Sequence, residues 1–175
     1  MKTTLNQIRE KYPCVEGWKK LLAHLGKTAA DDEPLAILTI LEANGLDDAL
    51  WCLRAVEGHD KEIRLYAVWC ARQVQNLMKD PRSVAALDVA EAYAHGNATK
   101  DEMAAAGDAA WAAAWAAAGD AAWAAAWDAA GYAARDAAGA AAGYAARDAA
   151  RDAQKQELLR VCAAIETAHG ITKGN

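Results

Sequence analysis

Apolar and polar residues alternate with a helical period along the first part of the chain. The segment "WKKLLAHLG" ends at Gly26, and "PLAILTILEANG" has Pro34 in its first turn and stops at Gly45. "LDDALWCLRAV" follows with Asp47 and Asp48 in its first turn, where carboxylates favour the positive end of the helix dipole. No window shows the period of two that is typical of a half-buried strand. The pattern predicts an all-helical protein, a compact multi-helix bundle.

A longer apolar segment, "DKEIRLYAVWCARQVQNLM", predicts the most enclosed helix, because more than one of its faces is apolar. Its core stripe consists of Ile63, Ala67, Cys70, Val74 and Leu77. Asp80 and Pro81 start the next helix, "PRSVAALDVAEAYAHG", which ends at Gly96. In "TKDE", Thr99 and Glu102 have the spacing of a capping box, which opens an alanine-rich region.

A four-residue repeat runs from Ala105 to Ala150, and two adjacent alanines recur in it at every fourth position. Alanine is the best helix former, so we expect this region to be helical. As one helix, the region would be on the order of 80 Å long, about twice the width of a globular chain of this size. We therefore expect it to fold back into closely packed helices, with breaks near Gly119 and between Gly139 and Gly143.

The closing segment, "KQELLRVCAAIETAHG", has the pattern of an amphipathic helix that packs on the amino-terminal helices. One face of it carries Leu158, Cys162, Ile165 and His169. The sequence predicts a single domain over 1–175. Its parts are a short-helix core at 1–98, alanine-rich helices at 99–153, and a closing helix and tail at 154–175.

Composition and charge narrow the class of protein. Alanine raises the hydrophobic fraction to 54%, and the large side chains include seven Trp and five Tyr but no Phe. The net charge of −5 argues against a protein that binds duplex nucleic acid by neutralising phosphates, and it favours a basic partner. No apolar run resembles a signal peptide or a membrane span, so we expect a cytoplasmic protein. We expect reduced core residues at the four scattered cysteines, Cys14, Cys52, Cys70 and Cys162.

Aromatic residues at the variable positions of the repeat are the first candidates for a binding site. They are Trp111, Trp115, Trp123, Trp127, Tyr132 and Tyr144. Tryptophan pairs at i, i+4 spacing suit stacking on a flat ligand or anchoring of a protein partner. The competing interpretation is that the rings fill the gaps that alanine leaves in a helical core.

Arginines replace the tryptophans later in the repeat, at Arg135, Arg147 and Arg151. Such a row suits a phosphate or a partner carboxylate. The alternative is a solvated face on which these arginines pair with acidic neighbours, at Asp136, Asp148 and Asp152. Three further arginines, Arg54, Arg64 and Arg72, lie among apolar residues, where we expect them to brace the fold through carboxylates at Asp47, Asp48 or Glu62. The alternative is that such a pair lines a polar pocket.

No motif in the sequence indicates catalysis. The four histidines, His24, His59, His95 and His169, have no partner at a convincing metal-ligand spacing. No nucleophile elbow, Walker loop, zincin helix or dinucleotide-binding fingerprint occurs. We therefore expect no enzymatic activity, no metal and no cofactor.

The run "DPRSVAALDVAEAYAHGNAT", followed by "AAAGDAAWAAAWAAAGDAAWAAAW", resembles the alanine-rich immunity proteins, a family linked to bacterial toxin systems and also found in phage genomes. In that family, too, an "ARQ…DPR…AL" helix precedes an alanine-rich array of variable length. The likeness covers residues 47–153. It implies a small, non-catalytic protein that neutralises a toxin or a defence component by binding it, and it carries over no binding residue.

These observations favour a binding protein that neutralises a toxin or a host defence effector. The stretch from Lys100 to Ala134 carries acidic residues but no Lys or Arg after Lys100, which suits a basic target surface. An alternative is a protein that sequesters a nucleotide-like small molecule among the Trp, Tyr and Arg side chains. A third is a structural module that forms homo-oligomers through its alanine-rich faces.

Overall fold

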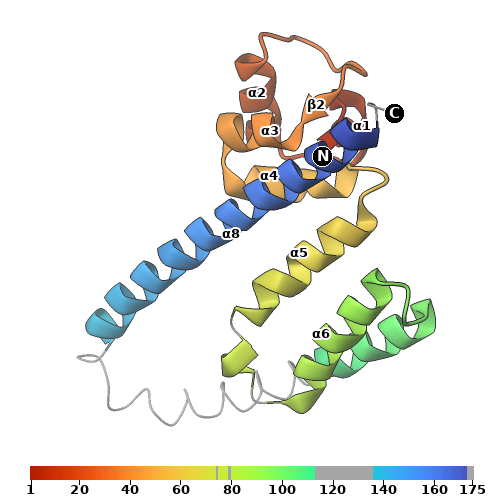
Figure 1. Ribbon diagram of the computed structural model, residues 1–175. Helices are drawn as coiled ribbons and strands as arrows, with labels where there is room; N and C mark the ends of the chain where they lie inside the picture. The colour runs from red at the N-terminus through yellow and green to blue at the C-terminus, as the bar shows by residue number, and fades with distance from the viewer. Residues whose placement is uncertain (74, 79, 113–135, 173–175) are drawn as a thin grey trace. The chain divides into compact units, whose positions relative to one another are not determined.

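Helices make up most of the chain, as the sequence predicts (Figure 1). The computed structural model describes residues 1–73, 75–78, 80–112 and 136–172. Contacts between residues divide the chain into two units. Unit 1 comprises Met1–Ile63 and Ala153–Asn175, and unit 2 comprises Arg64–Asp152. The single domain expected from the sequence stays a prediction.

Unit 1 is built around α3 (Ile37–Asn44), which packs against α2 (Val15–His24) and α4 (Leu46–Cys52). Ile37 and Ile40 have no exposed surface. A run of large aliphatic residues on a short helix explains this burial, because each such side chain gains about 1.5–3 kcal/mol by leaving water. The helix that carries the centre of unit 1 is therefore α3.

A two-stranded antiparallel sheet also belongs to unit 1, although the sequence analysis predicts no strand. β1 (Lys2–Thr3) pairs with β2 (Leu35–Ala36), and the backbone N–H of Ile37 donates to the carbonyl of Met1 at 3.1 Å. Strands of two residues are too short to show a period of two. The expected helix start at Pro34 is wrong, because the residues after it form β2 and α3 begins at Ile37.

Caps and a short 3-10 helix complete the amino-terminal part of unit 1. α1 (Leu5–Glu10) begins after Thr4, whose side chain accepts a hydrogen bond from the backbone of Gln7. The 3-10 helix η1 (Leu53–Ala55) continues α4. The buried hydroxyl of Thr3 donates to the carbonyl of Ala55 at 2.6 Å, which ties the chain's start to η1.

α5 (Asp60–Arg72) is less enclosed than the sequence pattern predicts, and the short 3-10 helix η2 (Gln75–Leu77) follows it. Tyr66 and Val68 are buried, whereas Ala67 of the predicted stripe is exposed. The predicted core stripe is therefore wrong, and so is the prediction that this helix is the most enclosed one. Apolar residues lie on several faces of α5, so periodicity alone does not select the packed face.

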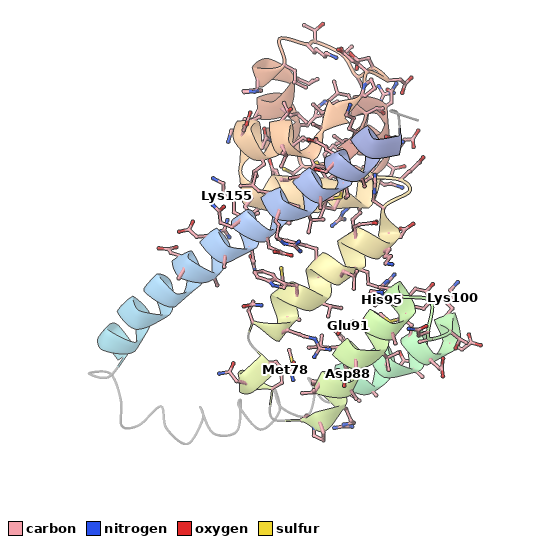
Figure 2. All side chains as sticks on the ribbon, viewed as in Figure 1. Met78, Asp88, Glu91, His95, Lys100 and Lys155 are labelled. Carbon is pink, nitrogen blue, oxygen red and sulfur yellow. The ribbon has the colours of Figure 1, made fainter. Side chains whose placement is uncertain are left out.

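α6 (Pro81–Ala94) follows the predicted signals closely. Asp80 caps its first turn by accepting from the backbone of Arg82, Pro81 occupies the first helical position, and Gly96 has a φ of +76° after its end. The carboxylates of Asp88 and Glu91, labelled in Figure 2, both accept from Arg72 of α5, at 2.8 and 2.6 Å. Arg72 thus braces the fold as expected, but its partners are carboxylates of α6 and not the ones expected from the sequence.

The other two arginines among apolar residues contact aromatic rings. The guanidinium of Arg54 lies 4.5 Å from the centre of the Trp51 ring, and that of Arg64 lies 4.8 Å from the centre of the Tyr93 ring. Arg54 is exposed and its Nε also donates to the carbonyl of Trp51 at 3.0 Å. Neither contact uses the carboxylates expected from the sequence.

α8 (Asp136–Thr172) runs without interruption through Gly139 and Gly143, so the break expected between them is wrong. A glycine inside a helix costs only about 1 kcal/mol relative to alanine, and the alanines around both glycines favour the helix. The other expected break, near Gly119, lies outside the described residues.

The carboxyl-terminal part of α8 confirms the predicted closing helix. Leu158, Cys162 and Ile165 are buried, and residues 153–175 group with residues 1–63 in unit 1. Burial raises the pKa of the Cys162 thiol, which also lies near the amino group of Met1. None of the helices in the described ranges has the length and apolar character that a bilayer span requires.

Candidate functional site

The nine residues proposed from the sequence differ in how far the structure describes them. Five lie outside the described residues, namely Trp115, Trp123, Trp127, Tyr132 and Arg135. Tyr144 and Arg147 belong to the part of α8 in which the backbone is described but the side chains are not. Trp111 and Arg151 are described with their side chains, and both are exposed.

The helix that carries Trp111 begins at Lys100 and is described as far as Ala112. The predicted capping box is present at its start. The backbone N–H of Thr99 donates to Glu102 Oε2 at 2.7 Å, and the backbone N–H of Glu102 donates to Thr99 Oγ1 at 3.2 Å. Hydrogen bonds from Thr99 lower the pKa of the Glu102 carboxyl, because they stabilise its ionised form.

Burial separates two faces of this helix. The half-buried positions are Met103, Ala106, Ala109 and Ala110. The exposed positions include Asp101, Ala104, Asp108 and Trp111, which follow each other at the three- and four-residue spacing of one helical face. We call these four residues the acidic face. It places one large ring and two carboxylates on a smooth alanine helix.

Trp111 is 68% exposed. Large aromatic rings are more often buried, because removing their large apolar area from water gives a favourable free energy. For this tryptophan, the described side chain does not fill a gap in a helical core. The interpretation of the repeat as a set of core rings is therefore wrong at this position.

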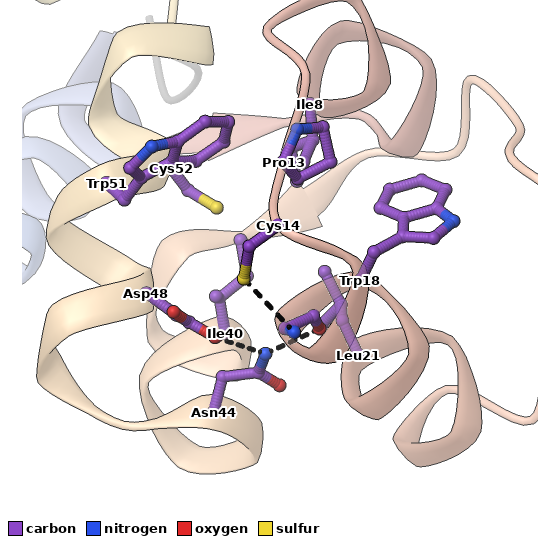
Figure 3. A pocket seen from close by; sticks show the side chains of 11 residues that line it. Ile8, Pro13, Cys14, Trp18, Leu21, Ile40, Asn44, Asp48, Trp51 and Cys52 are labelled. Atoms are coloured by element: carbon purple, nitrogen blue, oxygen red, sulfur yellow. Dashed lines mark hydrogen bonds between the residues drawn. The ribbon is translucent and has the colours of Figure 1, made fainter.

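A second candidate site is a pocket of about 70 Å³ within unit 1 (Figure 3). It lies between the segment that leads into α2, α2 itself, and the helices α3 and α4. Its walls are mainly apolar and include Trp18, Leu21, Ile40 and Trp51. Asp48, at the start of α4, is the charged residue among its lining residues.

Hydrogen bonds fix the carboxylate of Asp48 at the pocket. The side-chain nitrogen of Asn44 donates to Asp48 Oδ2 at 2.7 Å and to the carbonyl of Gly17 at 2.8 Å, as the dashed lines in Figure 3 show. A Cβ on Gly17 would lie 2.7 Å from Asp48 Oδ2, so a side chain at this position would displace the carboxylate. The buried Oδ1 of Asn44 has no hydrogen-bond partner among the described residues.

Two thiols line this pocket and differ in accessibility. Burial, with a smaller contribution from Asp48, raises the pKa of the Cys52 thiol to about 12, so it stays protonated at neutral pH. Cys14 is exposed, and its sulfur accepts from the backbone N–H of Gly17 at 3.3 Å. All the described cysteines are free of disulfides, but the expectation that Cys14 belongs to the core is wrong.

Pro13 and Cys14 line the pocket, and the residue on each side of this pair in the sequence is apolar and exposed. Tyr12 is 90% exposed and Val15 is 64% exposed. Tyr12 also has a φ of +57°, in the left-handed region that non-glycine residues rarely adopt. Neither a motif nor a helical period marks this stretch in the sequence. Its one signal is "KYPCVEGW", in which a tyrosine precedes a proline and two apolar residues lie near a helix start.

Metal binding has no support in the described ranges, where no three His, Cys, Asp or Glu side chains gather as metal ligands would. His59 Nδ1 lies 3.7 Å from Glu62 Oε2, a single pairing that requires a protonated histidine. A comparison with protein-family models gave no match for this chain, and neither did searches of curated proteins and of solved structures. The resemblance to alanine-rich immunity proteins stays a prediction.

Proposed function

We propose that the chain is a non-enzymatic binding protein that neutralises a toxin or a host defence effector by direct contact, and that the acidic face belongs to its contact surface. The observation that carries the proposal is the 68% exposure of Trp111 on the same helical face as Asp101 and Asp108. Tryptophan is among the residues that most often dominate the free energy of protein association.

The surroundings of Trp111 suit a protein surface as the partner. Covering this ring would remove a large apolar area from water, at roughly 25 cal/mol for each Å². Ala104 and its neighbour Ala105 are exposed and small, so the backbone of a partner can approach this helix closely. The exposed ring therefore offers a partner one large apolar contact on a helix of small residues.

Charge favours a basic partner. Asp101, Glu102 and Asp108 are exposed, and the sequence has no Lys or Arg between Lys100 and Arg135. Such a negative field speeds the encounter with a positively charged protein and fixes its orientation. The association should accordingly weaken as salt is added.

Most residues of the alternative site for a nucleotide-like molecule, in the alanine-rich repeat, lie outside the described residues, and a nucleotide-like molecule also exceeds the size of the pocket of unit 1. Its volume of about 70 Å³ is well below that of sites for small organic ligands, which are about 300–1,000 Å³. The contact between proteins is the function that the described surface favours.

The test is co-expression of the chain with the product of each neighbouring gene that arrests growth when expressed alone. We expect the chain to restore growth with one of them and to bind it after purification. Trp111→Ala should weaken that binding by at least about tenfold, because the partner loses its anchor. Light scattering of the chain alone shows whether the acidic face is instead used between copies.

A matched pair of double variants separates a local effect from a general effect of net charge. Asp101→Asn with Asp108→Asn removes two charges from the acidic face. Glu10→Gln with Glu57→Gln removes the same number from exposed positions of unit 1. Only the first pair should weaken binding and reduce its salt dependence. The proposal would be overturned if Trp111→Ala and the first double variant both bind the partner as strongly as the unchanged chain does.

A further inference from the structure

We infer that the pocket of unit 1 is a binding site for a lysine side chain presented by another protein. The pocket belongs to unit 1 and the acidic face to unit 2, so the test of this site needs no toxin or effector of the proposed function. It starts from the contrast between the apolar walls of the pocket and the single carboxylate among its lining residues (Figure 3).

The pocket matches the two parts of a lysine side chain. Trp18, Leu21 and Ile40 offer apolar surface to the methylene stem, and Asp48 offers a negative charge to the ammonium. Indole rings also attract cations. The Trp51 ring already carries the guanidinium of Arg54, 4.5 Å from its centre, so Trp18 is the indole that remains for a ligand cation.

The hydrogen bonds of Asp48 favour an ammonium over a guanidinium. Asn44 donates to Asp48 Oδ2 at 2.7 Å, and the other carboxylate oxygen, Asp48 Oδ1, accepts no hydrogen bond from the described residues. Arginine prefers to bind both oxygens of a carboxylate in parallel, whereas the compact ammonium of lysine can donate to one. A neutral amide donor such as Asn44 leaves the negative charge of the carboxylate for the ligand.

The position of the carboxylate is set before a ligand arrives. Asn44 joins it to the carbonyl of Gly17 at 2.8 Å, and the missing side chain of Gly17 leaves the space that Asp48 Oδ2 occupies. A carboxylate held in this way loses little conformational entropy when it binds, which favours recognition by a few contacts.

The size of the pocket limits the occupant. About 70 Å³ has room for about five water-sized spheres, which corresponds to the outer atoms of one long side chain. A nucleotide or another drug-sized molecule needs several times this volume. The occupant is therefore one side chain of a larger molecule.

Exposed apolar residues that flank two lining residues in the sequence favour a protein as this molecule. Tyr12 and Val15, which flank the lining residues Pro13 and Cys14, are 90% and 64% exposed. Exposed apolar residues around a pocket mark contact surfaces, and a tyrosine held at a φ of +57° is the kind of backbone strain found at binding sites.

The test uses the full chain labelled with ¹⁵N and the peptide acetyl-Gly-Lys-Gly-amide, followed by NMR at peptide concentrations up to about 10 mM. We expect saturable shifts of the indole N–H signals of Trp18 and Trp51 and of the Asn44 side-chain amide. Two peptides that replace lysine by norleucine or by acetyl-lysine keep the stem and lack the charge. They should bind at least about fivefold more weakly, because the ion pair with Asp48 is lost.

Variants assign the charge preference to one residue. Asp48→Asn should bring the lysine and norleucine peptides to within about twofold of each other, whereas the adjacent Asp47→Asn, which does not line the pocket, should preserve the difference. The peptide comparison needs no variant, so it decides the question even if Asp48→Asn does not fold. Equal binding of the lysine and norleucine peptides, tighter binding of an arginine peptide, or no shifts at these three side chains would overturn the inference.

Discussion

Unit 1 and the acidic face of unit 2 are stabilised in different ways. In unit 1, aliphatic residues from α1, α3 and α8 are almost fully buried. In the described part of unit 2, the buried residues are Tyr66, Val68 and Ala90. The helix of residues 100–112 instead uses a capping box, alanine and one half-buried stripe.

This difference shows where a chain can place exposed aromatic residues. A helix whose stability comes from its caps and from alanine does not need its large rings for packing. Trp111 is therefore exposed, whereas a large residue such as Leu158 in unit 1 is completely buried. Removing side chains from each region measures the contrast.

The largest expected effect follows from Leu158→Ala in α8. The substitution leaves a cavity among buried residues, so the free energy of unfolding should fall by about 3 kcal/mol in urea titrations followed by circular dichroism. Ala164→Ser, at an exposed position of the same helix, should change it by less than about 0.5 kcal/mol. A loss below about 1 kcal/mol for Leu158→Ala would mean that unit 1 is not the more tightly packed region.

Thiol reactivity should show the same contrast. In a Cys14→Ser background, Cys52 of unit 1 should react with a thiol reagent at pH 8 at least about a hundredfold more slowly than the half-buried Cys70 of unit 2. Burial keeps Cys52 protonated, since its pKa is about 12. Mass spectrometry of the labelled peptides gives both rates, and similar rates would contradict the assigned burial.

The pKa of Cys52 also fixes the sign of a pH effect. Its folded value, about 12, is raised from an ordinary value of 9.0, so the folded state holds the proton more tightly than the unfolded state. The stabilisation is complete below pH 9.0 and is lost as the pH rises toward 12. Cys52→Ala should reduce this alkaline loss of stability, which thermal unfolding between these pH values measures.

Removal of the cap should have a smaller effect, limited to the alanine-rich helix. Thr99→Ala deletes the hydroxyl that accepts from Glu102, so amide hydrogen exchange in residues 100–112 should accelerate by roughly fivefold. Lys100→Ala, which leaves the capping box intact, is the matched control. Equal acceleration in the two variants would show that packing, and not the cap, holds this helix.

The smallest expected effect concerns the start of α6. Hydrogen bonds from Arg82 lower the pKa of Asp80 from 3.8 to about 2, so their stabilisation is present above pH 3.8 and is lost as the pH falls through about 2. An NMR titration of the Asp80 carboxyl should show this low pKa. In Arg82→Ala the value should rise toward 3.8, and an unchanged value would exclude the guanidinium as the cause.

Local chemistry allowed the sequence to determine the helical class and several helix boundaries. The stop of α3 at Gly45, the start of α6 at Asp80 and the capping box at Thr99 each depend on residues within one helical turn. The sequence also showed that acidic residues, and no basic ones, follow Lys100 in this helix.

The pocket, the small sheet and the ion pairs of Arg72 could not be predicted from the sequence, because each forms between distant segments. Thr3 and Ala55 are 52 positions apart, and Gly17 and Asn44 are 27 apart, so no local period brings them together. The same holds for the continuous α8, where glycines that often end helices were tolerated. Short-range signals report which backbone conformation a segment prefers, whereas contacts between distant segments depend on how the whole core packs.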